Sequence, residues 1–150
     1  MAMSNPSSAA PLFMGEFRHA IDGKNRLTIP SEWRFEDEAE LFLLPESTGA
    51  CLKVMPRQEV ERLRAQASQL PGPQRAALNR VLGAGTRQVR LDKNGRLVLP
   101  PELCERLRLS GQVTLVGAIE TFELWNTRAW EAAKITTSAV AGPHMQELGL

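Results

Sequence analysis

A nine-residue stretch occurs twice in the chain and constrains its fold more than any other feature. The first copy, Asp22–Pro30, reads DGKNRLTIP, and the second, Asp92–Pro100, begins seventy residues later and reads DKNGRLVLP. A run of alternating apolar and polar residues precedes each copy, and a segment that begins like a helix follows it. The repetition predicts one small structural unit used twice, in an α+β fold of two tandem β units with short helices.

Each copy has the residues of a tight turn. Asp22 and Asp92 open the turns, and an aspartate there can accept a hydrogen bond from the backbone N–H group two residues later. The fourth position requires a positive φ angle, which glycine adopts freely and asparagine tolerates. Asn25 fills this position in the first copy and Gly95 in the second. These four residues are therefore the predicted turn-shaping residues.

Basic side chains follow or flank both turns. Arg26 and Arg96 come directly after the turns, and Lys24 and Lys93 lie within them. A guanidinium on a stiff turn can bind phosphate oxygens or form two hydrogen bonds with guanine. In the alternative, each arginine only pairs with the aspartate of its own turn, and such surface pairs contribute about 0–1 kcal/mol. Spacing alone leaves both interpretations open.

Two strands and a helix are expected around each turn. In the first unit, residues 27–29 form a return strand that closes a hairpin with the strand before the turn, and residues 89–91 and 97–99 form the equivalent hairpin in the second unit. Ser31 is the expected N-cap of the first short helix, and Thr127 that of the last helix.

The chain divides into five predicted parts. Residues 1–11 are a disordered tail, 12–59 the first unit, 60–86 a helical bridge, 87–134 the second unit, and 135–150 a flexible tail without clear periodicity. The net charge is only +1, so binding to an anionic partner requires segregated charge. The bridge and its flanks supply such segregation, because residues 53–90 contain eight Lys or Arg and only two acids.

The paired turns, each followed by L-x-[IL]-P and a short helix, resemble those of the MraZ family of bacterial transcriptional regulators. The family has two SpoVT-AbrB-like domains in tandem, which implies swapped-hairpin β units for this chain. Residues 13–19 resemble the family's opening, and residues 122–125 resemble the end of its second domain. The resemblance covers about residues 13–134 and is specific, because order, spacing and duplication agree.

This resemblance implies a regulator, usually a repressor, that binds repeated boxes in the promoter of the division and cell-wall gene cluster. Family members assemble into rings, expected here as an octamer or a dodecamer, in which hairpin turns face double-stranded DNA. The expected DNA-binding residues are Arg26, Lys24, Arg96 and Lys93. Asn25 stands where the family usually has glycine, and Lys93 lies one place earlier in its turn than Lys24, so the two turns differ in the position of their lysine.

Two rival functions stay open at this stage. In an AbrB-like antitoxin, similar turns bind DNA while the tail from about Ile135 holds a toxin protein. In a structural oligomer, the turns have no nucleic-acid role. An enzyme is not expected, because the chain lacks phosphate-loop, dinucleotide-binding and nucleophile-elbow motifs. Its two histidines and two cysteines lack zinc-site spacing, so neither a metal nor a cofactor is expected.

The first residues and the cysteines bear on the expected compartment. The N-terminal stretch lacks the charged start and apolar run of a signal peptide, and no stretch approaches the roughly 20 apolar residues of a membrane span. Cys51 and Cys104 lie in apolar contexts and are expected as buried thiols in a reducing cytosol. The expected location is the cytoplasm, in association with the nucleoid.

Overall fold

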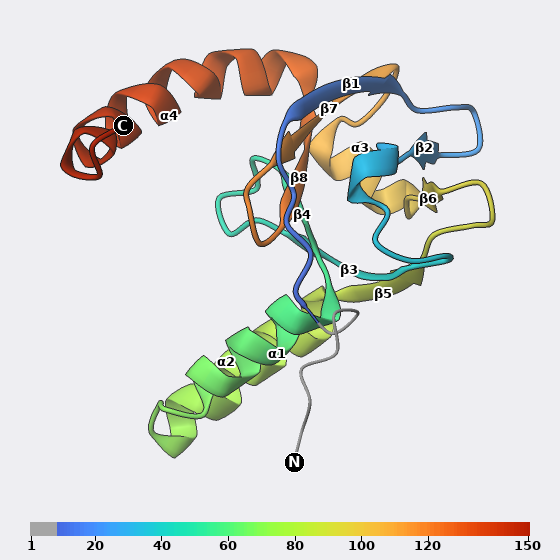
Figure 1. Cartoon of the computed structure of the whole chain (residues 1–150). Coiled ribbons are helices and arrows are strands. Elements are labelled where there is room, and N and C mark those ends of the chain that lie inside the picture. Colours follow the sequence, from blue (N-terminus) through green and yellow to red (C-terminus); the bar gives the residue numbers. More distant parts are fainter. Residues whose placement is uncertain (1–8) are drawn as a thin grey trace.

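The computed structural model describes residues 9–150, so most of the tail predicted over residues 1–11 lies outside the described residues. Figure 1 shows a β-rich body from which α4 and the α1–α2 pair project in different directions. No helix in the described part of the chain is long and apolar enough to cross a membrane. The elements, in chain order, are β1 (Glu16–Ala20), β2 (Arg26–Thr28), the 3₁₀ helix η2 (Ser31–Trp33), β3 (Glu40–Pro45), β4 (Leu52–Met55), α1 (Arg57–Ala67), α2 (Gly72–Gly85), β5 (Arg87–Arg90), β6 (Arg96–Val98), α3 (Pro101–Leu107), β7 (Gln112–Gly117), β8 (Phe122–Asn126) and α4 (Thr127–Glu147).

Strands from the two repeats are interleaved in a single sheet. Six strands pair antiparallel in the order β1-β7-β8-β4-β3-β5, and β2 pairs only with β6. The order is symmetrical, since β1, β3 and β4 of the first repeat occupy places equivalent to β5, β7 and β8 of the second. β1 pairs with β7, and β5 pairs with β3, so each repeat completes the sheet of the other. The predicted α+β class with tandem, strand-exchanging units is confirmed.

The strands on either side of each turn do not pair with each other, so the predicted closed hairpins are wrong. The strand after the first turn, β2, pairs with β6, the strand after the second turn, in a register that sets Leu27 opposite Leu97. Both leucines are fully buried. A hairpin closed within one repeat would be only three residues long and marginally stable in water. Pairing between repeats instead places both leucines in one core.

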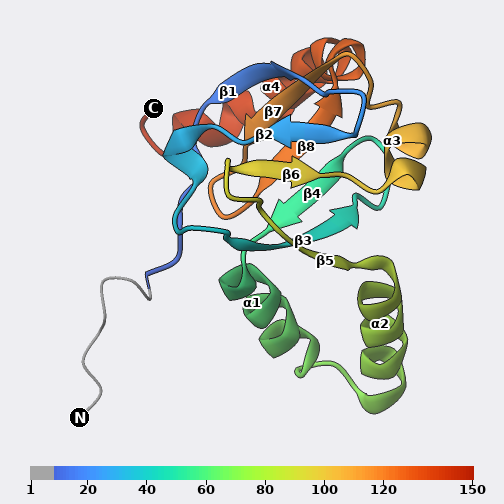
Figure 2. The ribbon, with the colours of Figure 1, turned by 90° about the vertical axis from the view of Figure 1, so that its right-hand side faces the viewer.

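That core contains residues from both repeats. The two-stranded ribbon of β2 and β6 lies against the six-stranded sheet, as Figure 2 shows, and buries its inner face there. Aromatic rings at one end of the core pack closely, with the centroids of Trp33 and Phe122 4.8 Å apart. The buried cluster comprises Phe13, Leu27, Ile29, Trp33, Ala39, Leu41, Leu43, Leu52, Val54, Leu91, Leu97, Leu99, Leu103, Cys104, Leu107, Leu109, Val113, Leu115, Phe122 and Leu124.

Short helices follow both strands of the ribbon. α3 begins at Pro101, where a proline costs no hydrogen bond because that N–H group has no partner within the helix. Its counterpart η2 is a single 3₁₀ turn, and its N-cap position is Pro30, not the predicted Ser31. The Ser31 hydroxyl instead donates to the Glu32 carboxylate, so it does not cap the helix.

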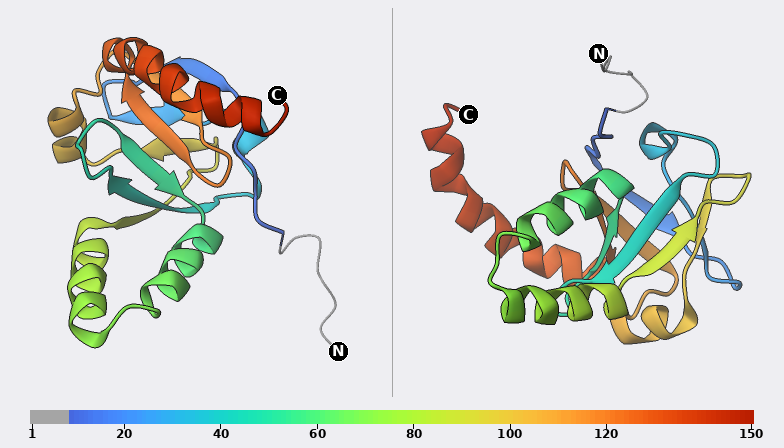
Figure 3. Two further views of the ribbon diagram at one scale, coloured as in Figure 1. Left: turned by 90° about the vertical axis from the view of Figure 1, so that its left-hand side faces the viewer. Right: turned by 90° about the horizontal axis from the view of Figure 1, so that it is seen from below.

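The predicted helical bridge consists of two helices, α1 and α2, which run in roughly opposite directions beside one end of the sheet (Figure 3). α1 contacts β3 and β4, whereas α2 contacts α1 and β3 and has no buried residue. The chain turns between them after Ser68, and Pro71 precedes α2. This arrangement leaves the apolar side chains Leu78 and Val81 of α2 exposed.

The C-terminal segment is helical, which corrects the predicted flexible tail over residues 135–150. α4 continues to Glu147 and is capped by Asn126, whose side chain accepts a hydrogen bond from the Ala129 N–H group. The N-cap therefore lies one residue before the predicted Thr127. From Ile135 onward almost every side chain of α4 is exposed and no face is buried, in agreement with the lack of hydrophobic periodicity in this part of the sequence.

Candidate nucleic-acid interface

The first turn is held together by Asp22. One oxygen of this carboxylate, Oδ1, accepts hydrogen bonds from the backbone N–H groups of Arg26 and Lys24, each at 2.9 Å. The other, Oδ2, accepts from Nε of Arg26 at 2.6 Å. The Arg26 backbone bond is the main cause that lowers the pKa of Asp22 to about 2, and the guanidinium and the Lys24 N–H group add to it. Asn25 closes the turn at φ 59°.

The second turn repeats these contacts almost atom for atom. Asp92 Oδ1 accepts from the N–H groups of Asn94 at 2.8 Å and Arg96 at 2.9 Å, and Oδ2 accepts from Arg96 Nε at 2.9 Å. The hydrogen bond from the Arg96 N–H group is again the main cause that lowers the pKa of Asp92. Gly95 closes this turn at φ 73°. Two different sequences, DGKNR and DKNGR, therefore form the same turn.

Each arginine pairs with the aspartate of its own turn and keeps part of its guanidinium available for another partner. Each uses Nε for its aspartate, and within residues 9–150 neither arginine engages its Nη groups in a hydrogen bond. The side chains of Arg26 and Arg96 are 31% and 29% exposed. The intraturn pair, which was the alternative interpretation of the spacing, is therefore present. It orients each guanidinium and leaves the two Nη groups for another acceptor.

Both arginines lie on one face of the β2–β6 ribbon. Arg26 is directly opposite Val98, and Arg96 is directly opposite Thr28. Because side chains alternate along a strand, these four residues share the face that points away from Leu27 and Leu97. We call them the ribbon face. The arginines occupy its diagonal, a separation of about 7–8 Å for such positions.

From the sequence alone, the arginines are expected on separate hairpins, and neither Thr28 nor Val98 is a predicted site residue. The alternation in Arg-Leu-Thr and Arg-Leu-Val could have placed each of these residues on the same face as its arginine. That the two faces form one surface could not be predicted from the sequence, because it depends on pairing between segments seventy residues apart.

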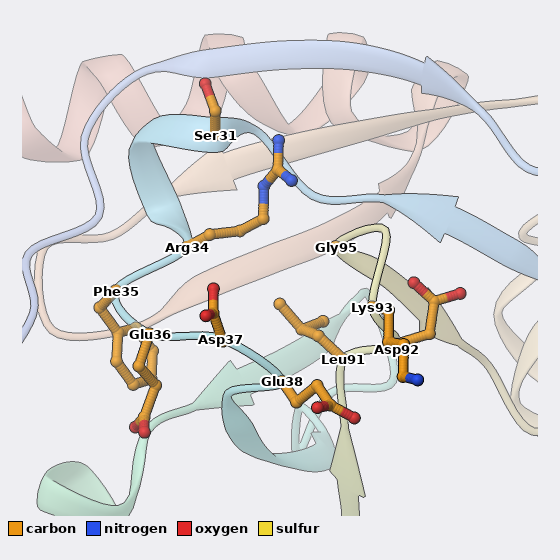
Figure 4. A pocket seen from close by; sticks show the side chains of 10 residues that line it. All are labelled: Ser31, Arg34, Phe35, Glu36, Asp37, Glu38, Leu91, Asp92, Lys93 and Gly95. Carbon is orange, nitrogen blue, oxygen red and sulfur yellow. The ribbon is translucent and has the colours of Figure 1, made fainter.

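The second turn has a neighbour that the first lacks. Arg34, which follows η2, lies over Gly95 so closely that a Cβ atom there would overlap its guanidinium (Figure 4). A depression of about 540 Å³ adjoins this contact, and Lys93 lies on its rim together with the acids of residues 36–38. The second turn therefore lies beside an acidic surface. The electrostatic surroundings of the second turn therefore include this acidic surface. Arg34 is not among the site residues predicted from the sequence.

The basic residues of the bridge and its flanks are partly neutralised within the chain. Arg57 donates to Glu40, Arg62 to Glu59, and Arg87 to Glu102. Arg64 lies 3.6 Å from a Glu61 oxygen. The excess of basic residues in residues 53–90 is thus partly balanced by ion pairs, which reduces its value as an anion-binding surface, whereas Arg75 and Arg80 of α2 form no ion pair within residues 9–150.

The side chains of His19, Cys51 and the three tryptophans have structural surroundings. His19 Nδ1 lies 2.8 Å from the Thr28 carbonyl oxygen, and the tryptophans Trp33, Trp125 and Trp130 are buried. Burial raises the pKa of the Cys51 thiol to about 12, with a smaller effect of nearby carboxylates. No group of three or more His, Cys, Asp or Glu side chains within residues 9–150 is arranged to hold a metal ion.

Two repeats that exchange strands around paired Asp–Arg turns define a tandem swapped-hairpin β protein. A family model described as "MraZ protein, putative antitoxin-like" matches residues 12–80 and again 82–140. The chain belongs to the MraZ family.

Relatives that are named transcriptional regulator MraZ align over most of the chain. A protein of Lachnoclostridium phytofermentans is 33% identical over 140 residues, which cover 93% of this chain and 99% of the relative. One of Roseiflexus castenholzii is 34% identical over 91% of this chain and 96% of its own length. One of Leuconostoc mesenteroides is 35% identical over 85% and 90%, respectively. The similarity thus spans both repeats and places the chain among proteins described as transcriptional regulators.

Proposed function

We propose that this protein is a sequence-specific DNA-binding transcriptional regulator, acting mainly as a repressor. It binds repeated boxes in the promoter of the division and cell-wall gene cluster and acts in the cytoplasm at the nucleoid, without catalytic activity. The observation that carries this proposal is the ribbon face, on which two oriented arginines from different repeats lie diagonally across from each other. Bound there, the protein excludes RNA polymerase from the promoter.

The geometry of the ribbon suits the major groove of DNA. The groove is about 12 Å wide and admits a two-stranded β ribbon. Arginine reads guanine by donating two hydrogen bonds to O6 and N7, and the Nη groups of Arg26 and Arg96 are available for this contact. The diagonal separation of about 7–8 Å compares with about 3.4 Å per base-pair step, so the two arginines can reach bases about two steps apart. Lys24 and Lys93 flank the ribbon and bind phosphates.

A ring assembly explains how a chain of net charge +1 binds a polyanion. We propose an octamer or dodecamer in which several ribbon faces engage successive boxes. Each subunit neutralises two or three phosphates, and linked sites gain affinity from their high effective concentration. Because every neutralised phosphate releases counterions, affinity then falls steeply with salt.

An antitoxin is the second candidate function, and the outer part of α4 favours it. This part projects from the body (Figure 1) and exposes the apolar side chains of Ile135, Val140 and Met145. The matching family model is itself described as antitoxin-like. A toxin bound to α4 would co-purify with the full-length chain and be lost from a variant with polar replacements at these three positions.

The arginines provide the test of DNA binding. Arg26→Ala and Arg96→Ala should each weaken binding to the DNA upstream of the protein's own gene by about tenfold or more, because a bidentate arginine–guanine contact discriminates by about 1–3 kcal/mol. Arg64→Ala is the matched control, since its side chain is 79% exposed on α1, which lies away from the ribbon (Figure 2). Light scattering should show the same oligomer for all variants. Unchanged footprints for both ribbon variants would refute the proposal.

A further inference from the structure

Two methyl-bearing side chains lie between the arginines and have no role in the proposal above. Val98 is 51% exposed, and among the exposed large apolar residues of the described chain it alone lies within a strand. Thr28 occupies the equivalent place in the first repeat and is also exposed. Single exposed apolar residues are common on protein surfaces. Here, however, both positions fall on the ribbon face, directly across from an arginine.

The register brings each of these side chains as close to an arginine as a β ribbon permits. The Leu99 N–H group donates to the Asn25 carbonyl at one end of the ribbon, and the Ile29 N–H group donates to the Gly95 carbonyl at the other. Because hydrogen-bonded and non-bonded pairs alternate in antiparallel strands, the two arginine-containing pairs are non-bonded pairs. In such pairs the Cα atoms are about 4.5 Å apart and the side chains are closest.

We propose that Val98 and Thr28 contact the 5-methyl groups of thymines that neighbour the guanines bound by Arg26 and Arg96. This inference rests on the proposed function. Thymine differs from cytosine in the major groove partly by its methyl group, which apolar side chains and the threonine methyl recognise. Each pair on the ribbon thus combines a guanine reader with a thymine reader, Arg26 with Val98 and Arg96 with Thr28.

The two pairs are not equivalent in chemistry. Val98 presents two methyl groups, whereas Thr28 presents one methyl and a hydroxyl group that can hydrogen-bond. Burying one methyl-sized group changes an equilibrium by about fourfold. We therefore expect the thymine contacted by Val98 to depend more strongly on its methyl group than the thymine contacted by Thr28. The two half-boxes read by one subunit would then differ.

Uracil substitution tests the contact without disturbing base pairing. In the footprinted upstream DNA, each thymine is replaced singly by uracil, which lacks only the 5-methyl group. For the wild-type protein, affinity should fall about two- to fivefold at one or two positions per box. The Val98→Ala variant should bind the thymine-containing DNA more weakly by a similar factor. At one of these positions, its affinity should no longer depend on whether the base is thymine or uracil. Thr28→Ser, which keeps the hydroxyl group, should lose the sensitivity at the other.

Two further variants control for folding and for general surface effects. Val98→Thr keeps strand propensity and one methyl group, so an intermediate sensitivity to uracil is expected. Val81→Ala removes an equally apolar side chain that is 67% exposed on α2 and should leave every uracil effect unchanged. Thermal unfolding of each variant identifies any loss that comes from instability.

The outcomes separate this inference from the proposed function. If the DNA is bound in an Arg26-dependent manner but no uracil substitution matters, or if Val98→Ala keeps the wild-type pattern of sensitivity, the thymine contact is wrong and the DNA-binding function stands. If the wild-type protein leaves its upstream DNA unprotected, the proposed function itself fails, and the inference fails with it.

Discussion

Replacing Gly95 by alanine should destabilise the protein through two separable effects. The first is backbone strain, because Gly95 has φ 73° and an L-residue in this left-handed region costs about 1–2 kcal/mol. The second is overlap, since the new Cβ atom would meet the Arg34 guanidinium and its Cδ atom. Arg34 is exposed and can move aside, so this overlap adds less than a buried clash, which costs about 1–3 kcal/mol.

The total loss expected for Gly95→Ala is about 1.5–2.5 kcal/mol of unfolding free energy, or roughly 3–10 °C in Tm for a chain of this size. A double-mutant cycle with Arg34→Ala isolates the overlap. Arg34→Ala alone should change stability little, and the double variant should recover about 0.5 kcal/mol relative to the sum of the single effects. Urea unfolding followed by circular dichroism measures all four proteins.

Asn25 provides the matched comparison in the first turn. It adopts φ 59°, and asparagine is among the residues that tolerate this region, so Asn25→Gly should be nearly neutral. Gly95→Ala within 0.5 kcal/mol of the wild type would contradict the strain argument, a threshold well below the ~1–2 kcal/mol expected for an L-residue there. A cycle with no coupling to Arg34 would instead contradict the close contact between the two residues.

Two further predictions concern the stability of the protein at low pH and the effect of the acidic residues 36–38 on DNA binding. The depressed pKa of Asp22, about 2 against an ordinary 3.8, means that its contribution to stability is complete above the ordinary value and is lost as pH falls through the lower one. Urea midpoints should therefore drop between about pH 4 and pH 2 more steeply in the wild type than in an Asp22→Asn, Asp92→Asn variant; parallel profiles would contradict this. Neutralising Glu36, Asp37 and Glu38 with Gln, Asn and Gln should tighten DNA binding several-fold at low salt, with the gain fading as salt screens it; equal anisotropy titrations at low salt would show that these acids do not act on the second turn.

The turns were predictable from sequence because their causes are local. Asp22 reaches N–H groups only two and four residues away, and the φ requirement at Gly95 is a property of that residue. Strands β3 and β7 of the six-stranded sheet also have local causes, since residues 41–44 and 113–116 are short and largely apolar runs. In contrast, the helix from Thr127 was predicted to end before residue 135. The outer part of this helix, from Ile135 onward, has no buried face, and the sequence there lacks the hydrophobic periodicity from which a helix could be predicted.

Only the tertiary structure decides which segments pair with each other. β2 and β6 are three residues long, and no local signal specifies that each pairs with the other instead of with the strand before its own turn. The burial of Leu27 opposite Leu97 selects that partner and that register, because a shift of one residue would turn one of the two leucines to solvent. The sequence by itself thus determined how each arginine is held by its aspartate. Long-range pairing determined that Arg26 and Arg96 share one face, with Val98 and Thr28 between them.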